Sequence, residues 1–242
     1  LKALVVSNQN INYYKKIYDL KDEEIIPIGV PRNNSKWMSS IFSNTKEFNN
    51  KILGDFVFLI SRPAQEYFIP LIRKKEYIKD INKICKKYNL NLVIKLHPKE
   101  STYHGKRIYY EILGKKNYNK NWFFSEENIY QIALKSKICL TFYTSVCIDF
   151  IKLNIPVIEI MNLRGIPEED NDFSLRDKRN SPITQYRNCG FVLGADNYDD
   201  LNKHAHQIIY NKENCMAFLK KNYEEYLSNP DNFDKLIPNN YF

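Results

Sequence analysis

Short apolar runs alternate with longer amphipathic segments through most of the chain, and this alternation constrains the fold more than any other feature. The runs contain few polar residues, which is typical of strands buried on both faces of a parallel sheet. In chain order they are DFVFLIS at 55–61, LNLVIKL at 90–96, KICLTFY at 137–143, IPVIEI at 155–160 and GFVLG at 190–194. We therefore predict an α/β fold with a doubly wound parallel sheet and right-handed crossovers.

Single helices are predicted between these strands. The segment KKEYIKDINKICKKYN, 74–89, has apolar residues at helical spacing, which indicates one buried face. Further helices are predicted over 126–136, with Ser125 as the N-cap, over 144–154, and at the C-terminal end over 198–211 and 212–227.

The opening of the chain has a pattern of its own. A strand, LKALVVS, is followed by a helix, NINYYKKIYDL, and by a second strand, EEIIPIGV. We predict that residues 1–35 are the last β/α unit of an N-terminal domain. The polar stretch 36–53 is predicted to be a linker or a loose helix, because a composition shift of this kind marks a domain boundary. Residues 54–242 are then expected to form the C-terminal domain.

Charge and cysteine content exclude several classes of protein. The 36 basic and 28 acidic residues leave a net charge of +8. The basic residues are spread along the chain, whereas a nucleic-acid binder gathers them in a stripe. The simplest interpretation of this charge is a soluble basic protein, and the alternative is that the charge attracts nucleotide phosphates or a lipid headgroup surface. The five cysteines form no CxxC pair, which predicts reduced thiols in a cytoplasmic protein. We expect no signal peptide and no membrane-spanning segment.

The residues that follow the predicted strands are the candidate site residues, because ligands of open parallel sheets bind at the carboxyl ends of the strands. Four such ends are Ser61-Arg62-Pro63, His97-Pro98-Lys99, Tyr143-Thr144-Ser145 and Met161-Asn162. Three of them carry groups that donate hydrogen bonds to anions.

His97 is the first candidate, and its alternative is a purely structural histidine at the end of a strand. Pro98 restricts His97 to extended geometry and thus sets the direction of the imidazole. Lys95 alternates with His97 along the strand, and Lys99 adds a cation at the same end. A histidine N–H donates to a phosphate oxygen, so these residues predict a phosphate contact.

Thr144 and Ser145 are the next candidates, because they stand where a helix is predicted to begin and free amides favour an anion. The alternative is an ordinary N-cap. Arg62 is expected to close the same pocket, or else to be a surface arginine in a loop. Glu159 is expected to hold ribose hydroxyls, or else to face solvent at the sheet edge.

Three segments together resemble the C-terminal, nucleotide-binding half of GT-B glycosyltransferases of bacterial surface-polysaccharide synthesis. IIPIGVPRNN is similar to the segment that closes the N-terminal half of CDP-glycerol glycerophosphotransferases. LVIKLHPKE resembles the strand-His-Pro motif that these enzymes share with bacterial sialyltransferases and Kdo transferases. NIYQIALKSKICLTFYTSVCIDFIKLNIPVIEI resembles the next block, in which a hydroxyl pair opens a helix. The resemblance covers Glu24 to Ile160.

The resemblance implies that residues 1–35 come from an acceptor-side domain and that residues 54–242 bind a nucleotide donor. In those families the histidine and the hydroxyl pair contact the phosphate of a cytidine nucleotide, and the histidine would stabilise the leaving phosphate. The donor-binding residues so implied are Arg62, His97, Pro98, Lys99, Thr144, Ser145 and Glu159. The acidic catalytic motif of the related sialyltransferases is absent, so the catalytic base is expected outside this chain, which we expect to be a fragment of a longer enzyme.

The function implied is transfer of a sugar or polyol phosphate from a CMP-sialic acid, CMP-Kdo or CDP-glycerol type of donor to a glycan or glycolipid acceptor. Capsule, lipooligosaccharide or teichoic-acid-like glycans would be the products. No metal or other cofactor is expected, since Asp170 and Asp172 lie in a polar loop typical of a solvated flap. The enzyme is expected in the cytoplasm, with peripheral association at the inner face of the membrane.

Two alternatives are left open. One is a UDP-sugar epimerase of GT-B fold, although those enzymes carry Ser-Gly-Gly where this chain has Tyr143-Thr144-Ser145. The other is a module that binds a nucleotide or a glycan without turnover. A nucleic-acid partner is not expected; such a binder would be recognised by an affinity that falls steeply with salt and by no preference for a mononucleotide.

Overall fold

The computed structural model describes residues 3–7, 9–44, 47–49, 54–66, 68–100, 103–166, 175–227 and 229. The chain forms two compact units, one of Leu1–Lys46 with Lys220–Phe242 and the other of Glu47–Leu219. Each unit has a parallel sheet of its own.

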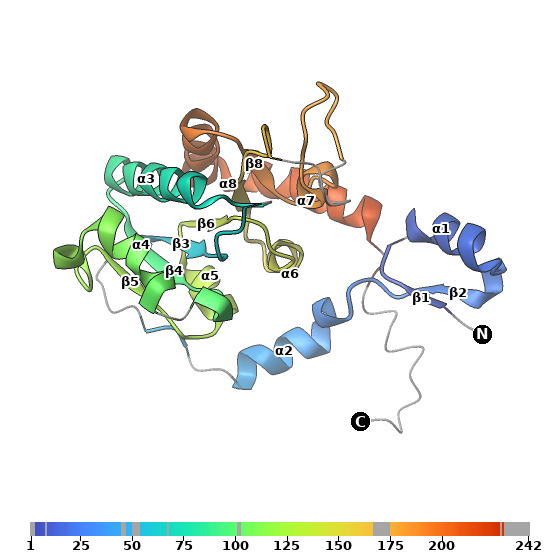
Figure 1. The fold of residues 1–242 in the computed structure, drawn as a ribbon. Coiled ribbons are helices and arrows are strands. Elements are labelled where there is room, and N and C mark those ends of the chain that lie inside the picture. Colours follow the sequence, from blue (N-terminus) through green and yellow to red (C-terminus); the bar gives the residue numbers. More distant parts are fainter. Residues whose placement is uncertain are drawn as a thin grey trace. The chain divides into compact units, whose positions relative to one another are not determined.

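The larger unit is built on a sheet of six parallel strands (Figure 1). The strands are β3 (Phe56–Ile60), β4 (Asn91–Lys95), β5 (Trp122–Phe124), β6 (Ile138–Thr141), β7 (Val157–Ile160) and β8 (Leu193–Ala195). Their order is β5-β4-β3-β6-β7-β8, so the direction of winding reverses between β3 and β6. At the centre, Phe58 pairs with Val93 on one side and with Cys139 on the other. The predicted α/β, doubly wound class is confirmed.

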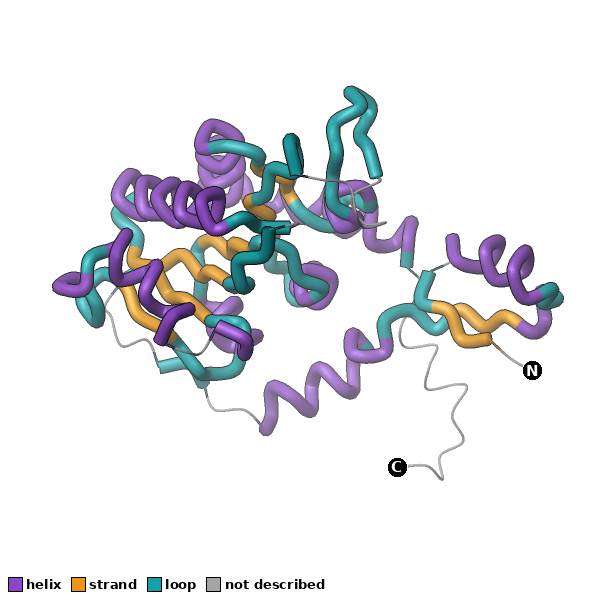
Figure 2. Tube along the Cα trace, in the orientation of Figure 1, coloured by secondary structure: helices purple, strands orange, loops and turns teal. Residues whose placement is uncertain are grey.

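Helices flank this sheet (Figure 2). They are α3 (Leu71–Lys87), α4 (Tyr103–Leu113), α5 (Ile129–Lys135), α6 (Val146–Lys152), α7 (Gln185–Asn188) and α8 (Tyr198–Tyr226). Helix α3 buries an apolar stripe that includes Tyr77, Ile81 and Ile84, at the helical spacing that the sequence predicted. Every residue of β3 is buried, as expected for a strand in the middle of a covered sheet. Within the described part of the chain, no helix has the length and apolar character needed to cross a membrane.

Helix α4 and strand β5 lie in a segment for which the sequence predicted no element. Strand β5 has only three residues, all of them aromatic and buried, and pairs with β4 as the edge strand of the sheet. So short a run gives no alternation to recognise. Trp122 Nε1 donates to the carbonyl of Gly114 at 3.3 Å and fixes the strand against the end of α4.

Two helix ends differ in how well they were predicted. Ser125 is not the N-cap of α5: the cap is Asn128, whose Oδ1 accepts from the amides of Tyr130 and Gln131 at 2.9 and 3.4 Å. An Asn side chain satisfies the free amides of a first turn as well as a serine does. The predicted boundary between the two closing helices is confirmed, because α8 is interrupted at Asn211 (φ −150°, ψ 51°).

The smaller unit has a two-stranded parallel sheet of β1 (Ala3–Val5) and β2 (Ile25–Pro27), connected by α1 (Gln9–Tyr18). Helix α2 (Ser35–Asn44) occupies the first half of the stretch 36–53 that was predicted to be a linker or a loose helix. The C-terminal segment joins this unit, since Ser7 Oγ donates to the Tyr226 carbonyl at 2.6 Å and Asn33 Nδ2 to the Tyr223 hydroxyl at 3.2 Å. The sequence placed that segment in the C-terminal domain, and the predicted domain boundaries remain predictions.

Candidate functional site

A cavity of about 410 Å³ lies at the carboxyl ends of β3, β4 and β6, where the winding direction reverses. Its lining comes from the ends of these three strands, including the two residues directly before α6, and from α5 and α7. The lining residues are Ile60, Ser61, Arg62, Lys95, Leu96, His97, Pro98, Ile129, Tyr143, Thr144, Ser145 and Tyr186. Of the predicted site residues, the cavity brings together Arg62, His97, Pro98, Thr144 and Ser145, which are up to 83 positions apart in the sequence (145 − 62).

The charge of this cavity suits an anion. Arg62 and Lys95 are the fixed cations of the wall, and His97 adds an imidazole. Among the described lining residues there is no carboxylate. Lys95 Nζ donates to the Glu127 carbonyl at 2.7 Å, and partial burial lowers the pKa of this lysine, although nearby Glu126 and Glu127 oppose the shift.

His97 is held by contacts to both its backbone and its ring. Its amide donates to Glu100 Oε2 at 3.2 Å, and its Nδ1 accepts from the Lys99 amide at 3.1 Å. The Lys99 contact fixes the tautomer of the neutral ring, because a nitrogen that accepts a hydrogen bond carries no proton. The ring proton is therefore on Nε2, and this N–H is the donor that the imidazole offers to a ligand.

Arg62 is tied to the neighbouring strand end rather than being a solvated loop residue. Its Nη1 donates to the Tyr143 carbonyl at 3.0 Å, and its guanidinium lies 4.4 Å from the centre of the Phe68 ring. Such a cation–π contact limits the mobility of the side chain and leaves other N–H donors of the guanidinium for further partners.

Tyr143 forms an aromatic wall that the sequence did not identify. Its ring lies 5.0 Å from Phe68 and 4.7 Å from Tyr186 of α7. Its backbone has φ 154°, outside the range that a residue with a side chain usually adopts. Its amide donates to Thr141 Oγ1 at 3.3 Å, which together with the Arg62 contact holds the turn after β6. Strained residues of this kind concentrate at functional sites.

Thr144 and Ser145 lie directly before α6. The carbonyl of Thr144 accepts from the Cys147 amide at 3.3 Å and the carbonyl of Ser145 from the Ile148 amide at 3.1 Å. Ser145 has helical dihedrals (φ −65°, ψ −13°), whereas a typical N-cap residue is extended. The pair therefore opens the helix as predicted, in a conformation other than that of an ordinary cap.

Lys99 does not line this cavity. It is exposed on the short 3-10 turn Pro98–Glu100 and lines a smaller cavity of about 260 Å³ beside it, together with Pro63, Leu71 and Gly105. Its predicted contact to a phosphate remains a prediction.

Glu159 is fully buried, so it neither faces solvent nor lines the cavity. Its Oε1 accepts from Thr184 Oγ1 at 2.7 Å and from Arg187 Nε at 2.8 Å. Burial raises the pKa of this carboxyl, while the Arg187 charge opposes the shift. A contact between Glu159 and a ribose remains a prediction that this placement does not favour.

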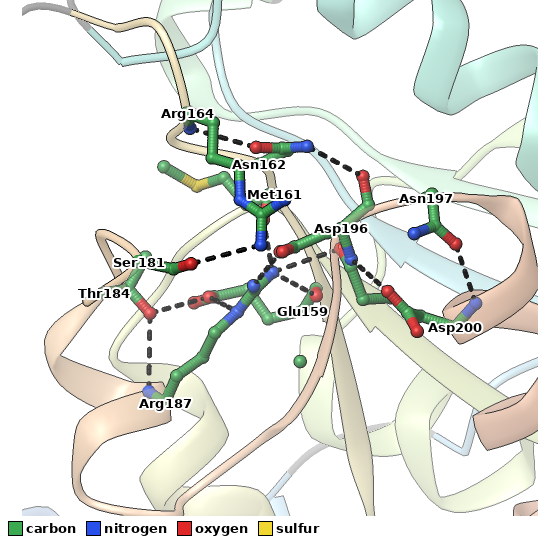
Figure 3. Close-up of polar contacts among 12 residues, drawn as sticks. Glu159, Met161, Asn162, Arg164, Ser181, Thr184, Arg187, Asp196, Asn197 and Asp200 are labelled. Atoms are coloured by element: carbon green, nitrogen blue, oxygen red, sulfur yellow. Dashed lines mark hydrogen bonds and ion pairs between the residues drawn. The ribbon is translucent and has the colours of Figure 1, made fainter. Parts of the chain in front are cut away.

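Arg187 forms hydrogen bonds at the carboxyl ends of both β7 and β8 (Figure 3). Besides Glu159, its guanidinium donates to Asp196 Oδ1 at 2.5 Å and to three backbone carbonyls, those of Glu159, Met161 and Ala195. Since Arg187 follows Tyr186 in α7, these bonds place the short helix and its tyrosine at the carboxyl ends of β7 and β8.

A second buried ion pair, between Lys74 of α3 and Glu100, was not predicted either. Both residues are 2% exposed, and Glu100 accepts a hydrogen bond from Ser61, whose hydroxyl also contacts that of Tyr109. Burial lowers the pKa of Lys74, with the Glu100 charge opposing the shift, and raises the pKa of Tyr109 well above its ordinary value.

The acidic residues Asp170 and Asp172, predicted to lie in a flap, are outside the described residues. In the described part of the chain, no three His, Cys, Asp or Glu side chains form a cluster able to hold a metal ion.

No family model and no curated protein matches the chain, but solved structures do. The UDP-GlcNAc 2-epimerase of Methanocaldococcus jannaschii, in complex with UDP-GlcNAc and UDP, superposes with a TM-score of 0.55 and 15% identity over 97% of this chain and 59% of its own. A putative UDP-N-acetylglucosamine 2-epimerase from Listeria monocytogenes gives 0.57 and 14%, over 94% of this chain and 55% of its own.

The wall teichoic acid polymerase TagF gives a TM-score of 0.53 and 13% identity, over 97% of this chain and 56% of its own. The chain thus spans less than two thirds of the length of each of these proteins. At this level of identity the likeness establishes the fold: the six-stranded unit is the Rossmann-like half of a GT-B fold.

Proposed function

We propose that the chain binds the phosphate of a nucleotide-activated donor in the cavity at the switch point and that it forms part of a GT-B transferase. One observation supports this most strongly: Arg62, His97, Thr144 and Ser145, from three strand ends, line a single cavity that has cations and no carboxylate among its described lining. Ligands of open α/β sheets bind at this place, where the strand order reverses.

In this proposal His97 Nε2–H donates to a phosphate oxygen. The bond strengthens as the leaving phosphate gains negative charge, so it favours the transition state over the bound donor. Arg62 and the hydroxyls of Thr144 and Ser145 supply further donors from the ends of β3 and β6. A protein-only set of donors of this kind needs no metal ion to neutralise the phosphate.

The donor is proposed to carry cytidine, as in CMP-sialic acid, CMP-Kdo or CDP-glycerol. The motif resemblance of LVIKLHPKE supports this choice, as does the structural likeness to a wall teichoic acid polymerase of which a variant was soaked with CDPG. The acceptor would be a glycan or a glycolipid of the bacterial surface, and the catalytic base would lie in a part of the enzyme outside this chain.

A UDP-sugar epimerase is the second candidate. It is favoured by the TM-scores of two 2-epimerases, which are as high as that of the polymerase. The same cavity would then hold the phosphates of a UDP-sugar, and the base would be uridine.

Calorimetric titration with CMP, CDP and UDP tests the proposal. We expect binding that favours cytidine, and a loss of about 1–3 kcal/mol in the His97→Ala variant, as for a lost charged hydrogen bond. His206→Ala is the matched control, because His206 is exposed on α8 and does not line the cavity. Preference for UDP would favour the epimerase, and an unchanged affinity of His97→Ala would remove the phosphate role.

A further inference from the structure

Four polar side chains meet in the protein interior beside the cavity, which one of them, Ser61, also lines, and the proposed phosphate contacts do not use them directly. They are Ser61, Lys74, Glu100 and Tyr109, and none is more than 4% exposed. Buried charges are unfavourable unless they are paired and hydrogen-bonded, and apolar residues of similar size are often at least as stable. The role of these four side chains therefore lies in the parts of the chain that they hold in place.

Glu100 holds the turn that carries His97. Its Oε2 accepts from the His97 amide at 3.2 Å, and its own amide donates to the His97 carbonyl at 2.7 Å. The turn brings the Lys99 amide onto His97 Nδ1 at 3.1 Å. A side chain at Gly105 would overlap the backbone of Glu100, so the turn is packed directly against α4. The Glu100 carboxylate thus acts on the ring through the shape of this turn.

Lys74 links the same carboxylate to the neighbouring strand end. Its Nζ donates to Glu100 Oε1 and, at 2.7 Å, to the Arg62 carbonyl. Ser61 Oγ donates to Glu100 Oε1 at 3.0 Å and accepts a hydrogen bond from the Tyr109 hydroxyl. One buried carboxylate therefore connects the backbones of both Arg62 and His97.

We infer that Glu100 and Lys74 are positioning residues: they fix the backbones of His97 and Arg62 so that the imidazole carries its proton on Nε2 and presents that N–H to the phosphate. The inference rests on the proposed function for its phosphate part only. The tautomer is a property of the unliganded chain and is measured without any nucleotide.

The test uses Lys74→Met/Glu100→Gln, which removes both charges together and leaves no lone buried ion. Nitrogen-15 spectra of the imidazoles report the tautomer, and His97→Ala identifies the His97 signals among the four histidines. We expect a single Nε2–H tautomer in the unaltered chain and a mixture of both tautomers in the double variant. Lys83→Met/Asp80→Asn removes an exposed ion pair elsewhere on α3 and should leave the spectrum unchanged.

Nucleotide affinity provides the second measurement. If the pair acts through His97, the double variant weakens binding by roughly tenfold, and adding His97→Ala to it gives less than the product of the two separate losses. An unchanged His97 tautomer in a folded double variant would overturn the inference, as would losses that simply multiply. Absence of binding by the unaltered chain would remove the proposed function alone, because the tautomer measurement would still stand.

Discussion

Two ion pairs with buried carboxylates lie at the carboxyl ends of the strands of the six-stranded sheet, and they differ in the parts of the backbone that they hold. Lys74–Glu100 connects the turns after β3 and β4 through one carboxylate, whereas Arg187–Glu159 connects α7 with the ends of β7 and β8 through one guanidinium. A lysine supplies a point charge, and an arginine supplies a planar fork of donors. The cation thus sets the number of backbone carbonyls held directly: one by Lys74 and three by Arg187.

The largest expected effect is on stability, from Arg187→Met. The substitution leaves Glu159 fully buried without its cation and removes the donors of three carbonyls. We expect the free energy of unfolding in urea to fall by about 3–5 kcal/mol. Arg187→Lys should recover only part of this, because one ammonium cannot reach all five acceptors. Full recovery by lysine would show that charge alone matters at this position.

A smaller loss, about 3 kcal/mol, is expected for Lys74→Met, because Glu100 keeps the Ser61 hydroxyl and the His97 amide as donors. Lys74→Met/Glu100→Gln should return to within about 1 kcal/mol of the unaltered chain, since no uncompensated charge remains. The free energies of unfolding of the three proteins in urea, measured under the same conditions, test this expectation. A double variant less stable than Lys74→Met would mean that the pair stabilises the fold rather than only orienting it.

The smallest expected effect is a dependence on pH at the Arg187 pair. Burial raises the pKa of Glu159 above its ordinary 4.5, so the folded chain binds more protons than the unfolded chain between the two values. This contribution is fully present below pH 4.5 and is lost as the pH rises through the raised pKa. Relative to Glu159→Gln, which cannot ionise, the unaltered chain should therefore lose stability over this window. Parallel pH profiles of the two proteins would contradict the raised pKa.

The sequence predicted the fold where local pattern determines it. Continuous apolar runs predicted β3, β4, β6 and β7, while β5 was missed because three aromatic residues form too short a pattern. Helix α4 was also missed, although its eleven residues are long enough for a helical pattern. The strand-end rule placed Arg62, His97, Thr144 and Ser145 together correctly, since it depends only on where strands end.

The rest of the site depends on pairings between distant positions. Lys74 and Glu100 are 26 residues apart, and Glu159 and Arg187 are 28 apart. Neither pair has a spacing that a helix or a strand would produce, so neither pairing could be predicted from the sequence. Tyr186 likewise gave no signal, because its part in the cavity wall depends on where Arg187 anchors α7.

The backbone of Tyr143 has a consequence for how this protein tolerates change. A glycine would adopt φ 154° without strain and should relieve about 1–3 kcal/mol of it. The same replacement would remove the ring that lies between Phe68 and Tyr186. Selection for greater stability and selection for an intact cavity wall therefore act in opposite directions on this one residue.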